Sequence, residues 1–245
     1  LIERGYEVIG LSRSHANTLW LTEIGAEART CDLFDRNSVL QTTRGADIIL
    51  HLATSIPSKA RTSKKDWAVN DRIRRDGTQN LLAAAKEHKT KLYLQQSIVF
   101  IYENQHGGLA DENTKLSDNG IDYLTSAVDM EEMVRFATDN EQLPATVLRF
   151  GSFYGADSAL TRRTIEALQN GFFPIIADGS YIYNVIHIED AVRAIELAIR
   201  NHEDVKGKVF NVTDGTPVRA SELYAGIAAM LGAPQPKQIP VWSAQ

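Results

Sequence analysis

The sequence predicts an α/β fold built on a doubly wound parallel sheet. Short apolar segments of strand length alternate with segments of helical length, and residues 47–52 are nearly all apolar. Strands that are apolar on both faces and alternate with helices are typical of a parallel sheet covered by helices on both sides. With 245 residues and 43% hydrophobic content, the chain can form one large core with a small second lobe.

The first half of the chain alternates strands and helices. Residues 6–11 form a short apolar strand that ends at Ser12, and a segment of helical length follows at residues 15–24 with Gly25 as its stop. The further elements expected here are a weaker strand at 26–30, a turn from Asp32 into a short helix at 36–43, a strand at 47–52, a polar loop at 54–65, a long helix at 67–88 and a strand at 91–102.

The second half continues the alternation with shorter strands. Helical periodicity resumes at Tyr123, and the last helix ends at Gly232, a residue typical of helix C-termini. The expected helices are 123–139, 158–169, 189–200 and 221–231, and the expected strands are 144–150, 181–187 and 208–212.

The stretch at residues 91–102 is the centre of the predicted sheet. Its apolar run ends in a polar tip at Gln95, Gln96 and Ser97. In an open α/β sheet, reacting groups collect at the carboxyl ends of the strands. Tyr123 opens the next long helix, so the Ser97 hydroxyl and the Tyr123 phenol can face one another over a bound cofactor. We take this pair as the predicted catalytic centre.

Composition excludes several classes of function. The formal net charge of −5 gives no broad attraction to nucleic acid or to an anionic membrane. The single cysteine, Cys31, excludes an internal disulfide framework and a thiolate-rich metal site, so a reducing cytoplasm is the expected compartment. No stretch resembles a signal peptide or a membrane span, and no spacing predicts a metal site.

Eight motifs in order support a family resemblance. They are GYEVIGLSRS at Gly5, DLFD at Asp32, ADIILHLAT at Ala46, GTQNLLAAA at Gly77, LYLQQS at Leu92, LRFGSFYG at Leu148, VIHIEDAVRAI at Val185 and FNVTDG at Phe210. On these motifs the chain resembles the extended or atypical short-chain dehydrogenase/reductase superfamily of the epimerase/dehydratase type. The resemblance implies a Rossmann-like NAD(P)-binding domain at residues 1–155. It implies a small mixed substrate-binding lobe at 156–245, whose strands and helices return to the main sheet.

One part of the resembled pattern is absent. In that family the first strand and a Gly-x-x-Gly-x-x-Gly turn hold the cofactor pyrophosphate at a helix N-terminus. This sequence begins after both, so the resembled domain is incomplete at its N-terminus. We expect weaker cofactor binding than in a chain that has them.

The resemblance implies NADP as cofactor, with NAD as the alternative. Arg13, after Ser12, ends the second strand of the family pattern, where a cation suits a ribose 2′-phosphate; the alternative is a solvent-exposed arginine. Asp32 either turns toward the adenine or is a plain turn aspartate. The other implied cofactor contacts are Leu52, Ala53 and Thr54 after one strand, and Phe150, Gly151 and Ser152 at the nicotinamide end.

The implied chemistry departs from the family at one position. In the resembled enzymes a tyrosine is the general acid/base, a lysine four positions later lowers its pKa, and a serine or threonine steadies the substrate oxygen. Ser97 and Tyr123 match, whereas Ala127 stands at the lysine position. A tyrosine without a cation is a poor base at neutral pH but can still donate a proton. The alternative for Tyr123 is a helix-terminal aromatic residue at a loop junction.

Three further positions differ from the resembled enzymes. Arg74 stands where the family commonly carries an asparagine, with Asn70 one helical turn earlier, and Tyr183 stands where sugar-nucleotide enzymes place a phosphate-binding arginine. The last difference argues against a nucleotide-sugar substrate. Gln95 and Gln96 either donate to a substrate carbonyl or bond within the sheet tip.

The sequence therefore supports two main hypotheses. The first is an NAD(P)-dependent oxidoreductase or epimerase-like enzyme acting on a small carbonyl or hydroxyl compound. The second is a catalytically weak or inactive NAD(P)-binding sensor, which Ala127 favours. RNA binding is the weakest hypothesis because of the acidic balance. The resemblance also implies a homodimer formed through the helices at 67–88 and 123–139.

Overall fold

The computed structural model describes residues 1–57, 62–105 and 108–244, so part of the predicted loop at 54–65, residues 58–61, lies outside the described residues. The chain divides into two compact units, each made of separate stretches of sequence. Unit 1 comprises Leu1–Gln105, Ala110–Arg149 and Ile195–Phe210, and unit 2 comprises His106–Leu109, Phe150–Ala194 and Asn211–Gln245.

Unit 1 follows the predicted alternation of strands and helices. It opens with a 3₁₀ turn at Ile2–Arg4, and Gly5 stops this turn in the left-handed conformation, with φ of 84°. Its elements are β1 (Ile9–Ser12), α1 (His15–Glu23), β2 (Glu27–Thr30), α2 (Arg36–Thr42), β3 (Ile48–His51), α3 (Lys64–Arg72), a π-helical segment (Ile73–Gly77), α4 (Thr78–His88), β4 (Leu92–Ile98), a 3₁₀ turn (Val99–Ile101), α5 (Asp122–Glu141), β5 (Ala145–Phe150), which ends on the first residue of unit 2, and α8 (His202–Val205).

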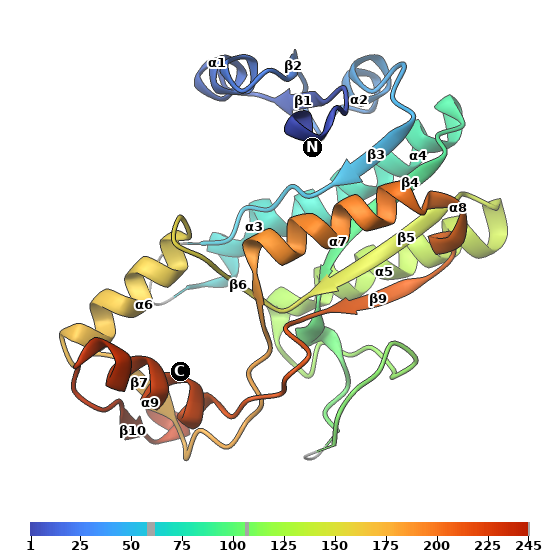
Figure 1. The fold of residues 1–245 in the computed structure, drawn as a ribbon. Coiled ribbons are helices and arrows are strands. Elements are labelled where there is room, and N and C mark those ends of the chain that lie inside the picture. Colours follow the sequence, from blue (N-terminus) through green and yellow to red (C-terminus); the bar gives the residue numbers. More distant parts are fainter. Residues whose placement is uncertain (58–61, 106–107, 245) are drawn as a thin grey trace. The chain divides into compact units, whose positions relative to one another are not determined.

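Two sheets occur among these elements. β1 and β2 form a parallel pair, and a four-stranded sheet has the order β3-β4-β5-β9, with β9 at Val209–Val212. β3 and β4 run parallel, with Ile48 opposite Leu92 and His51 opposite Gln95, as the apolar runs predict. Figure 1 shows the four strands side by side, with α4 and α5 next to each other against the sheet. The α/β class and the parallel pairing are therefore confirmed.

The helix expected at 67–88 forms, but it contains an irregular turn. α3 runs into the π-helical segment and then into α4 without leaving the helical region of backbone conformation, because Ile73 and Gly77 both have helical dihedral angles. A π-helical turn inserts an extra residue and rotates the side chains that follow. Gly77 packs closely here, since a Cβ would lie 2.8 Å from a methyl carbon of Leu33 and the leucine side chain would have to move.

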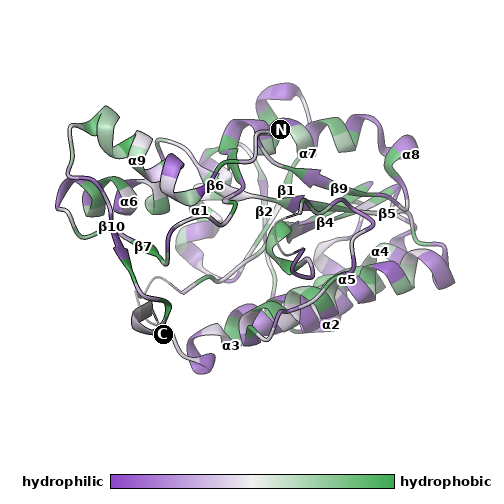
Figure 2. Ribbon diagram, turned by 90° about the horizontal axis from the view of Figure 1, so that it is seen from below, coloured by the Kyte–Doolittle hydropathy of each residue, from purple (hydrophilic) through white to green (hydrophobic). Residues whose placement is uncertain are grey.

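The core of unit 1 lies between the sheet and its helices. The buried cluster takes Val39 from α2, Leu81 and Ala84 from α4, Tyr93 from β4 and Val134 from α5. In Figure 2, α4 and α5 both carry hydrophobic residues interspersed with hydrophilic ones, as amphipathic covering helices do. Leu11 and Leu33 of the N-terminal part pack against this cluster.

Unit 2 has short strands and longer helices. Its elements are β6 (Ser152–Tyr154), α6 (Ala159–Gln169), β7 (Pro174–Ile176), β8 (Val185–His187), α9 (Ala220–Leu231), β10 (Lys237–Ile239) and a 3₁₀ turn (Val241–Ala244), and α7 (Ile188–Arg200) begins in it. β6 pairs with β8 and β7 with β10, both parallel. Gly232 ends α9 in the left-handed conformation, as predicted.

Some predicted strands are shorter than expected. The run at 91–102 forms a strand only at Leu92–Ile98 and then continues as the 3₁₀ turn at Val99–Ile101. The apolar run at 181–187 forms a strand only at Val185–His187. Ile182 instead makes an isolated antiparallel bridge to Arg219, and the Tyr183 amide donates to the Val218 carbonyl. Residues 182–183 of the run therefore pair with Val218 and Arg219 and do not extend β8.

Candidate active site

Ser97 lies near the tip of β4 with its hydroxyl unsatisfied. The residue is 3% exposed, and no described residue forms a hydrogen bond with its Oγ. A buried hydroxyl without a partner costs about 1–3 kcal/mol. This is the kind of group that a bound molecule would satisfy.

The neighbouring glutamine is fully engaged in the protein. Tyr93 donates its hydroxyl to Gln95 Oε1 at 2.7 Å, and Gln95 Nε2 donates to the Gln96 carbonyl at 2.9 Å. Gln95 is 2% exposed. Of the two interpretations of the glutamines, bonding within the sheet tip is correct for Gln95.

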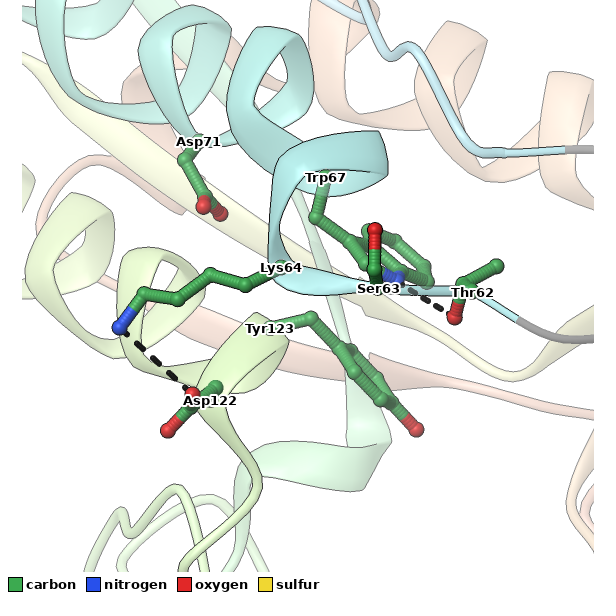
Figure 3. A pocket seen from close by; sticks show the side chains of 7 residues that line it. All are labelled: Thr62, Ser63, Lys64, Trp67, Asp71, Asp122 and Tyr123. Atoms are coloured by element: carbon green, nitrogen blue, oxygen red, sulfur yellow. Dashed lines mark hydrogen bonds and ion pairs between the residues drawn. The ribbon is translucent and has the colours of Figure 1, made fainter. Parts of the chain in front are cut away.

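Tyr123 lies in the first turn of α5, against α3. Its ring stacks on Trp67, with centroids 4.4 Å apart and an interplanar angle of 13°. Figure 3 shows the two rings face to face, with the Trp67 Nε1 donating to Thr62 Oγ1 at 3.0 Å. The tyrosine remains 38% exposed. The stack fixes the plane of the ring and leaves part of the side chain accessible.

A cavity of about 210 Å³ adjoins this stack. In Figure 3 the ring pair lies on one side, whereas Asp71 and the Lys64–Asp122 ion pair, with Nζ to Oδ2 of 3.6 Å, lie on the other. The lining residues are Thr62, Ser63, Lys64, Trp67, Asp71, Asp122 and Tyr123. The cavity is therefore aromatic on one side and charged on the other.

Ser97 and Tyr123 flank the same apolar cluster but do not bond to each other. Ile98, next to Ser97, and Leu124, next to Tyr123, both pack in a cluster with Ile101 and Ala127. The structure thus places the strand tip and the start of α5 on the same apolar cluster. Because Ser97 Oγ has no partner among the described residues, its hydroxyl is not joined to the phenol.

Ala127 is fully buried in this cluster. Its exposed fraction is 0%, and its neighbours are apolar. A lysine at this position would have to place its stem among Ile101 and Leu124. Ala127, which stands where the resembled enzymes carry a lysine, therefore lies in a closed apolar environment on that side of α5.

Asn70 is a site residue that the motif pattern did not assign. It is 0% exposed, and its Oδ1 accepts a hydrogen bond from the Ser55 amide at 2.9 Å, beyond the end of β3. Its Nδ2 has no partner among the described residues. Asn70 and Ser97 thus present two unsatisfied polar groups from α3 and from the tip of the strand next to β3. The one signal in the sequence was its position one helical turn before Arg74.

His51, at the end of β3, is a core residue. It is 2% exposed, and its Nε2 donates to the Ile73 carbonyl at 3.3 Å. Burial lowers the pKa of His51 to about 4, and the bond to Ile73 opposes the shift only weakly. The ring is therefore neutral at physiological pH and supplies no charge.

The predicted adenosine-binding residues lie at the ends of β1 and β2. Ser12 Oγ accepts from the Ser14 amide at 3.1 Å, and Asp32 Oδ1 accepts from the Phe34 amide at 3.0 Å, which makes Asp32 a turn aspartate. Arg13 lies over the Phe34 ring at 5.3 Å, and Arg72 of α3 lies over the same ring at 4.0 Å. Two guanidinium groups therefore contact the Phe34 ring, and that of Arg72 is also paired with Asp76, with Nε to Oδ2 of 3.1 Å.

Leu52, Ala53 and Thr54, which follow β3, are exposed. Their exposure leaves this strand end open to a ligand.

The remaining predicted contacts, Phe150, Gly151 and Ser152, belong to unit 2. Gly151 has no room for a side chain because a Cβ would lie 2.9 Å from the Asn184 carbonyl oxygen. Ser152 Oγ donates to Tyr183 Oη at 3.0 Å, and the Phe150 ring lies 5.3 Å from that of Phe153. The glycine is fixed by backbone packing within unit 2.

A buried ion pair fixes α5 to β5. Arg149 donates to Glu131 through Nε at 3.0 Å and through Nη2 at 2.6 Å, and both side chains are about 5% exposed or less. Arg149 Nη1 also donates to Tyr102 Oη at 2.7 Å. The pair holds the helix that carries Tyr123 against the sheet, and sequence reasoning missed it because the partners are distant in the chain.

The described residues hold neither a candidate metal site nor a helix that could span a membrane. No group of three or more His, Cys, Asp or Glu side chains in that part of the chain could hold a metal ion. No helix there is long and apolar enough to cross a bilayer.

The parallel sheet with covering helices and the polar strand tips define a Rossmann-type α/β protein. The chain belongs to the NAD dependent epimerase/dehydratase family, whose sequence model matches residues 1–213. This confirms the resemblance drawn from the eight motifs.

Two reductases are among its relatives. The chain is 27% identical over 215 residues to 3-diazoavenalumate denitrifying reductase of a Streptomyces species, covering 85% of this chain and 69% of the relative. It is 27% identical over 246 residues to 2-alkyl-3-oxoalkanoate reductase of Stenotrophomonas maltophilia, covering 96% and 71%.

Solved structures of nucleotide-sugar enzymes share the fold. dTDP-glucose 4,6-dehydratase from Streptomyces venezuelae, with NAD bound, has a TM-score of 0.79 at 21% identity, covering 98% of this chain and 76% of that chain. UDP-glucose 4-epimerase from Thermus thermophilus, in complex with NAD, has a TM-score of 0.77 at 20% identity, covering 98% and 80%. At this identity the likeness concerns the fold alone.

Proposed function

We propose that the chain is an NAD(P)-dependent oxidoreductase for a small carbonyl or hydroxyl compound. The observation that carries the proposal is the buried, unsatisfied Ser97 hydroxyl at a parallel-strand tip next to the helix whose first turn carries Tyr123. When bound, the nicotinamide cofactor supplies or accepts the hydride. In the reducing direction Ser97 donates a hydrogen bond to the substrate carbonyl oxygen, and Tyr123 donates the proton that this oxygen takes up as the hydride reaches the carbon.

Hydride transfer, followed as the absorbance of the reduced cofactor over a panel of aldehydes and ketones, tests the proposal. We expect Ser97→Ala and Tyr123→Phe each to lower kcat/KM by about 100-fold or more, the usual contribution of a positioned acid or a polarising donor. Tyr6→Phe, a tyrosine outside the site, is the control. Unchanged turnover in both site variants would contradict the assignment.

A second function follows from Ala127. Because α5 carries no cation at this buried position, Tyr123 is an inefficient base, and the chain would serve as a cofactor-binding sensor with little turnover. Tight NAD(P) binding by calorimetry, without turnover over the whole panel, would favour this alternative.

For the cofactor we propose NADP over NAD. The two guanidinium groups of Arg13 and Arg72 beside Phe34 support this choice, since a 2′-phosphate is a dianion that arginine binds with two parallel hydrogen bonds. We expect Arg13→Ala to reduce the affinity ratio of NADP to NAD by about tenfold, the equivalent of one charge-assisted contact. Arg36→Ala, an arginine in α2, is the control. An unchanged ratio would favour NAD.

For the substrate we propose a compound that is not a nucleotide sugar. Tyr183, whose hydroxyl is bonded to Ser152, carries no charge to pair with a diphosphate at the position where the resembled sugar enzymes place an arginine. Both reductase relatives are named for substrates that are not nucleotide sugars. Competitive inhibition of turnover by micromolar UDP or dTDP would contradict this proposal.

We also propose that the chain forms a homodimer through α3, α4 and α5. Val69 on α3 and Phe136 on α5 are 45% and 60% exposed, so these helices offer apolar surface. Sedimentation equilibrium should give a dimer that Phe136→Glu weakens. A monomer at micromolar concentration would contradict it.

A further inference from the structure

Two consecutive arginines of the π-helical segment contact α5, but in different environments. Arg75 Nε donates to Asp129 Oδ2 at 2.6 Å, and both side chains are about 40% exposed. Arg74 is 8% exposed and lies between the segment and the first turn of α5. The irregular turn therefore directs one arginine to a surface ion pair and the other inward.

Arg74 bonds to the turn that carries Tyr123. Its Nη1 donates to the Tyr123 carbonyl at 2.9 Å and lies 3.3 Å from Ser126 Oγ. Ser126 in turn donates its hydroxyl to Asp71 Oδ1 at 2.7 Å. The connected groups are therefore Asp71, Ser126, Arg74 and the Tyr123 backbone.

This placement is unfavourable for stability alone. Among the ion pairs of the described residues, none includes Arg74, and burial lowers the pKa of its guanidinium while Asp71 opposes the shift at longer range. A cation beside the first turn of a helix also opposes the helix dipole. Apolar residues of similar volume often replace such buried charges without loss of stability, so the arginine calls for a reason beyond folding.

The absence of a lysine at position 127 gives a functional reason for the buried Arg74. The lysine of the resembled enzymes would come from α5 itself, but here Ala127 is enclosed by apolar side chains. Arg74 reaches the same turn from the opposite helix, through the residue that precedes Ala127. A positive charge is thus brought to the start of α5 by a different element.

We infer that Arg74 is the positioning residue of this site, which fixes the first turn of α5, and with it the Tyr123 ring stacked on Trp67, in place of the absent lysine. The inference rests on the oxidoreductase function proposed above. Arg74 acts through the backbone of Tyr123 and does not touch the reacting atoms.

Three variants test the inference. We expect Arg74→Met to lower kcat by tenfold or more with the KM for cofactor changed less than threefold, because the substrate and cofactor still bind while the Tyr123 ring is no longer held in place. Lys64, Asp71 and Asp122 are the other charged groups around Tyr123, and all are retained. Arg74→Lys should recover part of the loss because it keeps the charge. Arg75→Met, the matched control, should change kcat less than twofold.

A second measurement does not depend on turnover. The near-ultraviolet circular dichroism of the stacked pair is defined as the signal that Tyr123→Leu removes. Arg74→Met should reduce this signal by at least half while the far-ultraviolet spectrum stays that of the folded chain. A retained signal with an unchanged kcat would overturn the inference. Absent turnover in the parent chain would instead refute the proposed function and leave the dichroism as the test of Arg74.

Discussion

Acid should destabilise the folded chain through His51, and the effect can be isolated by substitution. The folded state holds the pKa of this ring at about 4, below its usual value of 6.5, because the side chain is buried. Above pH 6.5 the ring is neutral in both states and has no effect. Below pH 6.5 the histidine of the unfolded chain binds a proton, whereas the buried ring of the folded chain stays neutral until about pH 4. The free energy of unfolding therefore falls as the pH falls.

The magnitude follows from the difference between the two pKa values. A gap of about 2.5 units corresponds to about 3 kcal/mol once the pH is below 4, and to about 2 kcal/mol at pH 5, at about 1.4 kcal/mol per unit. Because the residue is only 2% exposed, solvent screening reduces this little. Carboxylates such as Asp118, whose pKa is lowered by the Gly120 amide, add to the acid sensitivity of the whole chain.

The assay is urea unfolding at about pH 7.5 and about pH 5 for the parent chain and for His51→Gln, whose amide can still donate to the Ile73 carbonyl. The parent should lose about 2 kcal/mol more than the variant over this interval. His88→Gln is the control, because His88 also bonds a carbonyl, that of Leu40 at 2.9 Å, from a partly exposed position. Equal losses in the parent and His51→Gln would refute the reasoning.

Three further substitutions test packing around the site, all by urea unfolding. Arg149→Met leaves the buried Glu131 charge unpaired and should cost about 3–5 kcal/mol, against less than about 1 kcal/mol for Arg75→Met at the exposed pair. Gly151→Ala should cost about 1–3 kcal/mol because its Cβ meets backbone, whereas Gly226→Ala, in open space on α9, should stabilise by about 0.5–1 kcal/mol. Ala127→Lys should cost about 3 kcal/mol or more by burying an ammonium group among apolar side chains. Equal effects of Arg149→Met and Arg75→Met, or of Gly151→Ala and Gly226→Ala, would contradict the packing described. An Ala127→Lys variant as stable as the parent chain would contradict it too.

The order of helices and strands in unit 1 could be predicted from the sequence because hydrophobic periodicity and glycine stops are local signals. The same signals placed Ser97 at a strand tip and Tyr123 at a helix start. The π-helical segment could not be predicted, since an extra residue in a turn leaves no periodic signature in so short a stretch. The three-residue strands β7 and β10 were missed for the same reason of length.

The site's supporting contacts were beyond sequence reasoning because they join distant residues. Trp67 was predicted only as the start of a helix, yet it stacks on Tyr123. Arg74 was identified as a departure from the family pattern, but its bond to the Tyr123 carbonyl depends on the rotation that the π-helical turn imposes. Such pairings are set by tertiary packing, which propensity does not encode.

The β1–β2 pair has its own consequence for local motion. Among the described residues its ladder shares no strand pairing with the four-stranded sheet, so it is attached by side-chain contacts, such as the packing of Leu11 and Leu33 and the bond from Asn80 Nδ2 to the Leu33 carbonyl at 2.9 Å. A segment attached in this way can detach and reclose while the rest stays intact. Amide protons of β1 and β2 should therefore exchange with solvent deuterium earlier than those of β4. Arg13, directly after β1, would then lie in a segment that opens before the four-stranded sheet does.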